Sequence, residues 1–300
     1  MSEEAQARAA RLSETPMRLA VPATSFTRGA TQSLKDIWAR RELLGMLVRR
    51  ELRARYKDSS LGFIWSLIRP LVQLAIYYVA IGQFLGAWRL IPDFAIYVFT
   101  GLTVWQLFLE IVSSGTGSII ANGGIIKKTY LPREIFPLAS VGSALVNFAV
   151  QFTILIVAAL VIRGLIVDRR LLFIPLSVLV IIVWGTALAL LLSAVNVYLR
   201  DVQYLVEVAL MVGFWASPIV YSWEMVSGEI SSALENLYLL NPVTLAVLGL
   251  QRGVWTAGAD APLPSNLDLR LAAALGAGLV AVALAQRAFA IMQRNFAQEL

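Results

Sequence analysis

The chain has 300 residues, of which 58% are hydrophobic and 15% are charged, and its mean hydropathy is +0.72. Soluble domains carry about 25% charged residues, so this composition, with its long uncharged runs, predicts an integral membrane protein. The chain contains no cysteine and no histidine. The sequence therefore excludes disulfides, thiol chemistry and histidine-based metal or acid–base sites, and we expect no metal centre.

The formal net charge is +6. A basic soluble protein would point to nucleic acid, but here the positive residues gather beside the first apolar run. Anionic lipid and membrane topology explain that placement better, so we expect a membrane partner and no nucleic acid. Residues 1–30 are polar and lack an apolar core, which predicts a loosely ordered leader and no signal peptide.

Residues 31–58 have the period of an amphipathic helix. Apolar residues such as Leu44 and Leu47 recur near one face of this helix, and several arginines lie on its other faces. The pattern is typical of a helix in the membrane interface, and it also fits a helix packed on the protein's own cytosolic face; the two are compatible. The polar residues assigned to this interface helix are Arg49, Arg50, Arg53, Arg55, Tyr56 and Lys57.

Six apolar segments follow, and a helix needs about 20 residues to cross the bilayer core. We expect Pro70 to open the first span, because its missing N–H costs nothing at the start of a helix. The fifth span is short and broken by Pro218, and the sixth is rich in Ala and Gly. The predicted fold is an all-α integral membrane domain over residues 59–300. Its predicted spans are 70–88, 94–120, 135–162, 171–199, 208–223 and 271–287.

Residues 224–269 separate the last two predicted spans. They contain one apolar run, 243–250, which is too short to cross a bilayer. Asn241 and Pro242 precede this run, and Arg252 follows it. We favour external re-entrant helices here over a helix on the outer surface.

Lysines and arginines near the span ends predict the orientation. Seven of them lie in residues 40–57, so we place the N-terminus in the cytosol, and six spans place the C-terminus there too. Arg163, Arg169 and Arg170 oppose this assignment, but the N-terminal cluster is larger. The expected location is the cytoplasmic (inner) cell membrane.

The sequence offers little chemistry for catalysis. It has no GxxxxGK[ST] phosphate-binding loop and no acidic pair on a predicted cytosolic loop, so we expect no bound cofactor and no enzyme activity in this chain. Glu110 is the only acid in the predicted spans, fewer than an ion-coupled carrier usually needs. Glu110 is either functional or paired structurally with an interfacial arginine, Arg69 or one from the interface helix.

Aromatic residues are numerous, with 13 Phe, 9 Tyr and 8 Trp. We expect most of them in the interfacial belts of a membrane protein. A minority can line a channel, where flat rings stack on sugar faces in many registers. The channel candidates are Tyr77, Tyr78, Trp105, Phe108, Glu110, Phe214 and Trp215.

Residues 122–137, NGGIIKKTYLPREIFP, connect the second and third spans. Asn122-Gly123 favours a turn or cap, and the residue before Pro132 avoids helix geometry, so we predict a short helical elbow. Its apolar and cationic side chains suit contact with another protein; the alternative is an ordinary positive-inside loop. The candidate contact residues are Asn122, Ile125, Ile126, Lys127, Lys128, Tyr130, Arg133 and Glu134.

Three blocks of sequence occur in a characteristic order. They are RRELRARYKDSSLGFIWSLIRPL at 49–71, the elbow, and RDVQYLVEVALMVGFWASPIVY at 200–221 followed by NPVT at 241–244. Together they resemble the ABC-2 type exporter permeases of the polysaccharide branch, which exports O-antigen, teichoic acid and mycobacterial galactan. The resemblance covers most of the chain from about residue 35. Arg69 departs from it, because the family more often has an uncharged residue before that proline.

The resemblance implies a homodimer of permeases bound to two copies of a separate ATPase subunit, which would bind ATP and magnesium. The elbow would be the coupling helix seated in an ATPase groove, with the interface helix as a second contact. The cargo would be a polyprenyl-diphosphate-linked polysaccharide, either O-antigen or, from the Arg-rich composition, an actinobacterial galactan. The external gate would include Pro218, Tyr221, Asn241, Pro242 and Arg252.

Two other functions remain open. The same fold can export a drug or a small lipid, although the basic helix and its Tyr-Lys and Leu-Gly-x-x-Trp continuation favour a glycan. A membrane-embedded glycosyl or lipid transferase is the third hypothesis, which the lack of histidine and of acidic cytosolic pairs disfavours.

Overall fold

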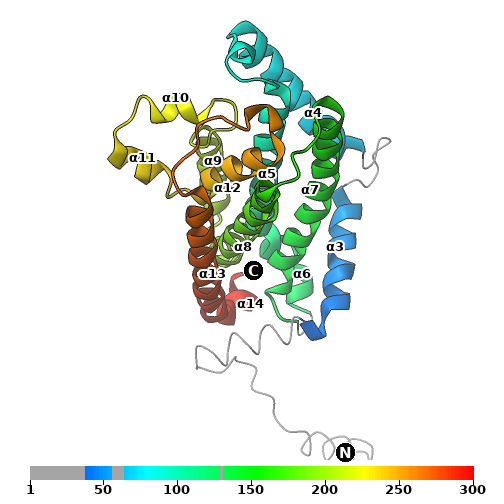
Figure 1. The fold of residues 1–300 in the computed structure, drawn as a ribbon. Helices are drawn as coiled ribbons and strands as arrows, with labels where there is room; N and C mark the ends of the chain where they lie inside the picture. Colours follow the sequence, from blue (N-terminus) through cyan, green and yellow to red (C-terminus); the bar gives the residue numbers. More distant parts are fainter. Residues whose placement is uncertain (1–37, 56–63, 129–130) are drawn as a thin grey trace, which may run out of the picture.

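The computed structural model describes residues 38–55, 64–128 and 131–300, and the regular structure in these ranges is helical (Figure 1). Within them, five helical stretches are long and apolar enough to cross a membrane, and a bent pair of helices makes a sixth if it counts as one span. The expected all-α integral membrane fold is confirmed. The leader 1–30 and Tyr56, Lys57 and Tyr130 lie outside the described residues.

Helix α5 (Phe94–Ala121) is the centre of the bundle (Figure 1). Helices α7 (Ile135–Ile162) and α8 (Phe173–Tyr198) pack along it, and most α5 side chains are buried. A helix that is apolar all round belongs inside a bundle, which fits the composition of α5. The bounds of α5 and α7 agree with the predicted spans 94–120 and 135–162 to within one residue.

Small residues bring α5 and α8 close together. A Cβ atom added at Gly115 would lie 2.5 Å from Cβ of Ala189, and one added at Gly185 would lie 2.8 Å from Cγ2 of Ile111. Lipid supplies no hydrophobic drive for helix association, so close van der Waals packing of this kind holds membrane helices together. A turn of 3₁₀ helix, η4 (Arg169–Leu172), precedes α8, in place of the predicted start at 171.

The first span differs from its prediction. Helix α4 (Trp65–Tyr77) continues into a π-helical segment, η2 (Tyr78–Phe84), so this stretch covers 65–84 instead of 70–88. Pro70 lies inside α4 and is buried, so the expectation that it opens the helix is wrong. A proline inside a helix removes one backbone hydrogen bond and its ring crowds the carbonyl four residues earlier, but α4 continues through Pro70 to Tyr77.

The fifth predicted span, 208–223, is also wrong in extent. Helix α9 (Val202–Trp215) has 14 residues, about 21 Å, which is too short to cross a core of about 30 Å. The chain then leaves helical geometry before Pro218, and Ile219 is fully buried. A Cβ atom at Gly101 would lie 3.1 Å from the Ile219 Cα atom, so this glycine lets the segment lie against α5.

The region 224–269 forms α10 (Trp223–Ser227), α11 (Ser232–Tyr238) and α12 (Pro242–Val254). Helices α11 and α12 meet at 88°. Helix α12 is largely buried against α5 and α8, whereas α10 and α11 protrude to the side of the bundle (Figure 1). Re-entrant insertion of α12 into the membrane remains a prediction, which this bend favours.

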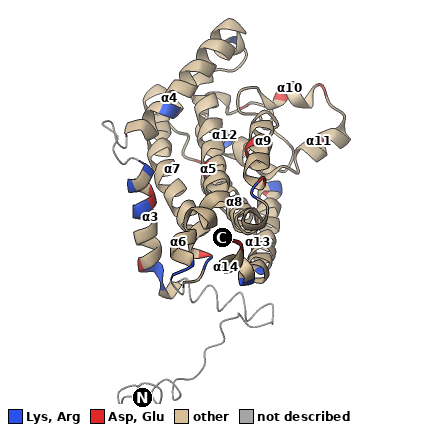
Figure 2. Ribbon diagram, turned by 180° about the vertical axis from the view of Figure 1, so that it is seen from behind, with Lys and Arg blue, Asp and Glu red and all other residues tan. Residues whose placement is uncertain are grey.

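The last long helix, α13 (Leu267–Met292), extends beyond the predicted 271–287 at both ends. Arg270 and Arg287 lie within it near its ends, where long side chains reach polar surroundings. Two short turns follow, η6 (Gln293–Asn295) and α14 (Phe296–Glu299). They lie at the same end of the bundle as the elbow helix α6 (Gly123–Ile126), and lysines and arginines gather on this end and on α3 (Arg41–Arg55) (Figure 2).

We expect Gly115→Ala to lower the free energy of unfolding by about 1–3 kcal/mol, because the new methyl group overlaps Ala189 and the two helices must separate. Thermal unfolding of the detergent-solubilised protein measures this change. Gly276→Ala on α13 is the matched control, since no atom lies within 4 Å of its added carbon. Equal melting temperatures for the two variants would contradict the role of Gly115.

Candidate functional site

The elbow is a single helical turn whose predicted contact residues point in different directions. Lys127 and Lys128 are exposed, whereas Asn122 and Ile126 are buried. The Asn122 Nδ2 atom donates to the Ser118 carbonyl at 2.8 Å, and its Oδ1 atom accepts from Arg50 of α3. Asn122 therefore ties the elbow to α3 and is not part of the exposed surface.

The side chains of Arg133 and Glu134 both form hydrogen bonds within the protein. The Arg133 guanidinium donates to the Gln293 carbonyl and lies 5.6 Å from the centre of the Phe296 ring. The Gln293 side chain in turn donates to the Glu134 carboxylate at 3.3 Å. Of the predicted cationic contact residues, Lys127 and Lys128 are the two that the structure leaves on the surface.

The C-terminal residues brace the elbow, which sequence analysis missed. Phe296 is fully buried and packs edge-to-face on Tyr198 and Phe289. Leu300 lies within 3.6 Å of the position that a Cβ atom at Gly123 would take. The available signal was an isolated phenylalanine in the polar tail QRNFAQEL.

Helix α3 lies within the predicted interface helix 31–58, of which the structure describes residues 38–55, and α3 packs along α7. Its one buried residue is Leu47. On the same side, Glu51 accepts a hydrogen bond from Ser140 of α7 at 3.1 Å, and burial raises the pKa of this carboxyl group. Together with the Arg50–Asn122 bond, these contacts hold α3 on the bundle.

Glu110 is the one charged residue of α5, and 8% of its side chain is exposed. It forms an ion pair with Arg55 of α3 and accepts a hydrogen bond from Asn147 Nδ2 of α7 at 2.6 Å. The partner is therefore an arginine of the interface helix and not Arg69, whose side chain is exposed. The geometry favours the structural interpretation of Glu110 over the channel interpretation.

Several channel candidates meet in a groove between α4, α5 and α9. The groove has a volume of about 330 Å³, and its lining includes Tyr77, Trp105, Phe214 and Trp215. The Tyr77 and Phe214 rings stack with their centres 5.6 Å apart, and the Trp105 ring meets Phe214 edge-on at 5.8 Å. We call this cavity the aromatic groove.

The other candidates lie elsewhere. Phe108 is buried behind Trp105, and Tyr78 is exposed beside Gln83, which donates to its hydroxyl at 3.1 Å. The aromatic groove also contains polar groups that the sequence analysis did not select: Gln73, Ser113 and Glu207. Glu207 was not among the predicted channel residues because the fifth span was predicted to begin at 208, whereas α9 begins at Val202.

Three of the five predicted gate residues, Tyr221, Asn241 and Pro242, lie near the bend between α11 and α12, where the Tyr221 hydroxyl is 3.1 Å from the Tyr238 hydroxyl. The Pro218 carbonyl instead accepts a hydrogen bond at 3.1 Å from Gln251 Nε2, near the other end of α12. The Tyr97 hydroxyl of α5 lies 2.7 Å from the Tyr221 carbonyl and 3.1 Å from the Pro218 carbonyl. Asn241 caps α12, with its Oδ1 atom accepting from the Val243 amide at 3.0 Å, and Pro242 follows at the first position. Arg252 also lies near that other end of α12, where it donates to the Ala259 carbonyl.

Comparison with known proteins identifies the family. The model of the ABC-2 type transporter family matches residues 42–255, more than two thirds of the chain, so the chain belongs to this family of transporter permeases. It is 29% identical over 218 residues to the O-antigen export system permease protein RfbA of Myxococcus xanthus, covering 73% of this chain and 82% of that protein. The RfbA permease of Klebsiella pneumoniae is 30% identical over 191 residues, covering 63% and 73%. The resemblance seen in the three sequence blocks is thereby confirmed.

We expect Arg55→Gln to destabilise the protein more than the double substitution Arg55→Gln/Glu110→Gln. The single change leaves a buried carboxylate without its cation, while the double change removes the charge as well. The difference should be on the order of 1–2 kcal/mol, because Arg55 is about one-third exposed and solvent screens the pair. Melting temperatures of the variants in detergent test this expectation. Purely additive effects would show that the pair does not couple α3 to α5.

Proposed function

We propose that this chain is the membrane-spanning permease of an exporter that carries a lipid-linked polysaccharide across the cytoplasmic membrane. Membership of the ABC-2 family and the O-antigen export names of the relatives support this cargo class. The observation that carries the proposal is the aromatic groove. Its stacked rings stand beside amide, hydroxyl and carboxylate groups, the combination that binds sugar faces and sugar hydroxyls.

The open side of the aromatic groove supports a homodimer. The helices on either side of it, α4 and α9, expose apolar side chains, among them Ile76 and Val208. A second copy facing the groove would enclose it and form a continuous passage lined by rings from both copies. This arrangement lets a long glycan pass without a tight binding site.

The energy for export is proposed to come from two copies of a separate ATPase subunit. The chain carries no phosphate-binding loop of the Walker type, which supports placing ATP hydrolysis in a separate subunit. Lys127 and Lys128 offer an exposed cationic contact on the elbow. Because α6 follows α5 directly and is tied to α3 and the C-terminal turn, force on the elbow would reach the central helix.

The proposed carrier of the glycan is a polyprenyl diphosphate. The relatives favour an O-antigen type of polysaccharide, and the actinobacterial galactan remains a second candidate supported by composition alone. No contact in the described residues favours the drug or small-lipid cargo.

Depletion of the chain in its native host should cause lipid-linked glycan to accumulate on the cytosolic side, measured by extraction and glycan analysis. Restoration with Trp215→Ala should give about fivefold slower export, because about 1 kcal/mol of ring stacking is lost. The matched control is Trp88→Ala, which removes an exposed tryptophan outside the aromatic groove. Normal glycan distribution after depletion would refute the cargo class, and full export by Trp215→Ala would remove the groove from the path.

The double charge reversal Lys127→Glu/Lys128→Glu should reduce recovery of the ATPase subunit in pull-downs by tenfold or more, because opposite charges would face the partner surface. Export should fall in parallel while the melting temperature stays within about 1 °C of the wild type, since both side chains are exposed.

Arg89→Glu is the matched control, an exposed arginine in the 3₁₀ turn η3 (Ala87–Arg89) between η2 and α5, far from the elbow in sequence and in the fold. Arg133→Glu should instead lower the melting temperature, because that guanidinium is bonded inside the chain. Unchanged recovery and unchanged export in the lysine variant would exclude the elbow as the ATPase contact.

A further inference from the structure

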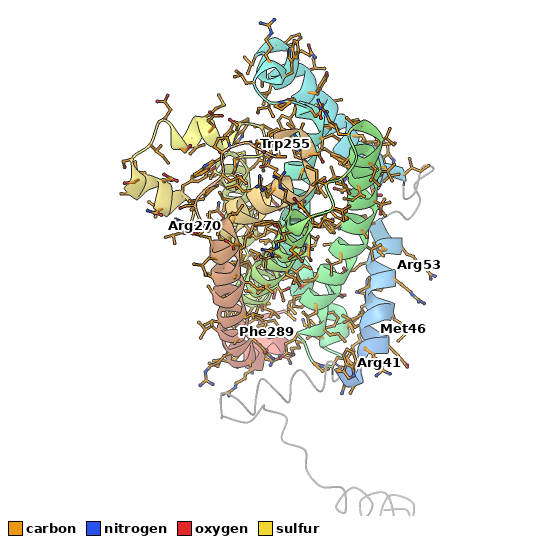
Figure 3. The ribbon with its side chains drawn as sticks, in the orientation of Figure 1. Arg41, Met46, Arg53, Trp255, Arg270 and Phe289 are labelled. Atoms are coloured by element: carbon orange, nitrogen blue, oxygen red, sulfur yellow. The ribbon has the colours of Figure 1, made fainter. Side chains whose placement is uncertain are left out.

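Helix α3 has two different faces. Its inner face packs Leu44, Leu47 and Val48 into the apolar cluster at the elbow end of the bundle. Its outer face has Arg41, Arg49 and Arg53 with the exposed Met46 among them, and the exposed Trp38 lies just before the helix begins. Figure 3 shows that the labelled side chains of Arg41, Met46 and Arg53 point away from the bundle.

The cations on the outer face lack acidic partners within the described ranges. Arg49 and Arg53 form none of the described ion pairs, and Arg41 lies over the Trp38 ring at 5.8 Å. The face is hollowed by about 500 Å³, and the lining residues are Met46, Arg49, Arg50, Arg53 and Ala54. Of the two acids of α3, Glu51 is turned inward, which leaves Glu42 as the only acid on the exposed side.

The length of the neighbouring helices indicates the depth of this face. Helices α5 and α7 have 28 residues each, about 42 Å, and exceed the hydrocarbon core by about 12 Å. Arginines are costly in hydrocarbon, so the cationic side chains on the outer face of α3 lie in the headgroup layer at the elbow end or reach toward it. Further along α7, most of the exposed side chains are apolar, including Val157 and Val161, as expected for a surface against lipid tails.

We propose that the outer face of α3, formed by Arg41, Arg49 and Arg53 with Trp38 and Met46, binds anionic phospholipids of the adjoining leaflet. Guanidinium groups match phosphate oxygens in charge and geometry, and tryptophan favours the membrane interface. The face lies to the side of the bundle, below a lipid-facing surface, which suits a lipid better than a soluble subunit seated under the elbow.

Lipid bound at this face would also act on the elbow. It would hold α3 against α7, and the Arg50–Asn122 bond passes that restraint to the first residue of the elbow. The inference concerns the membrane composition that the transporter requires and does not depend on which cargo it exports.

The test uses the full chain in nanodiscs of phosphatidylcholine alone or with 30% phosphatidylglycerol, a proportion of about one lipid in three. We expect phosphatidylglycerol to raise the wild-type melting temperature, and native mass spectrometry to detect retained phosphatidylglycerol. In Arg41→Gln/Arg49→Gln/Arg53→Gln the apparent affinity for this lipid should fall about a hundredfold, at about 1 kcal/mol per arginine. Arg89→Gln/Arg169→Gln/Arg200→Gln, which removes three exposed arginines elsewhere, should behave like the wild type.

The proposal is overturned if the triple variant keeps its preference for phosphatidylglycerol, or if the control variant loses it equally. It is also overturned if inorganic phosphate at matched ionic strength reproduces the stabilisation, or if the triple variant loses only the ATPase subunit, which would mark the face as a protein contact. If the triple variant unfolds in phosphatidylcholine, the single variant Arg53→Gln is measured in the same way. Its apparent affinity for phosphatidylglycerol should be about fivefold lower than that of the wild type, and an unchanged affinity overturns the proposal.

Discussion

The pairing of Glu110 with Arg55 is the interaction on which the elbow end of the molecule depends. A carboxylate enclosed in the central helix would be costly without a cation, and the arginine that supplies it belongs to α3. Helix α3 is thereby drawn against α7, where Glu51 meets Ser140 and Arg50 reaches Asn122. One buried charge thus explains why a basic helix stands beside the bundle and why the elbow is attached to it.

The central helix connects all the proposed sites. Tyr97 near its start holds the segment beside the proposed gate, Trp105 forms one wall of the aromatic groove, and Asn122 at its end begins the elbow. Because α5 is buried along its length and interlocked with α8, it moves with the packed core around it. A displacement at the elbow would therefore be carried toward the groove and the gate within one element, without a separate relay.

The elbow shows how tertiary contacts sort residues that look alike in sequence. Lys127, Lys128 and Arg133 form one basic cluster in the chain, but the arginine is held by the C-terminal turn, while the lysines stay on the surface. The turn lies beyond residues 42–255, which the family model matches. The exposed part of the elbow is accordingly smaller than its composition indicated.

The sequence by itself determined the membrane class, the family and the bounds of α5 and α7, because long uncharged runs flanked by polar residues form spanning helices wherever they pack. It did not determine the ends of α4 and α9, because the effect of a proline depends on its position in a helix. Pro70 lies inside α4, whereas α9 ends before Pro218. Only the tertiary structure decided which rings share a groove and which arginine meets Glu110. Those choices depend on which helix faces meet, and they join residues far apart in the chain.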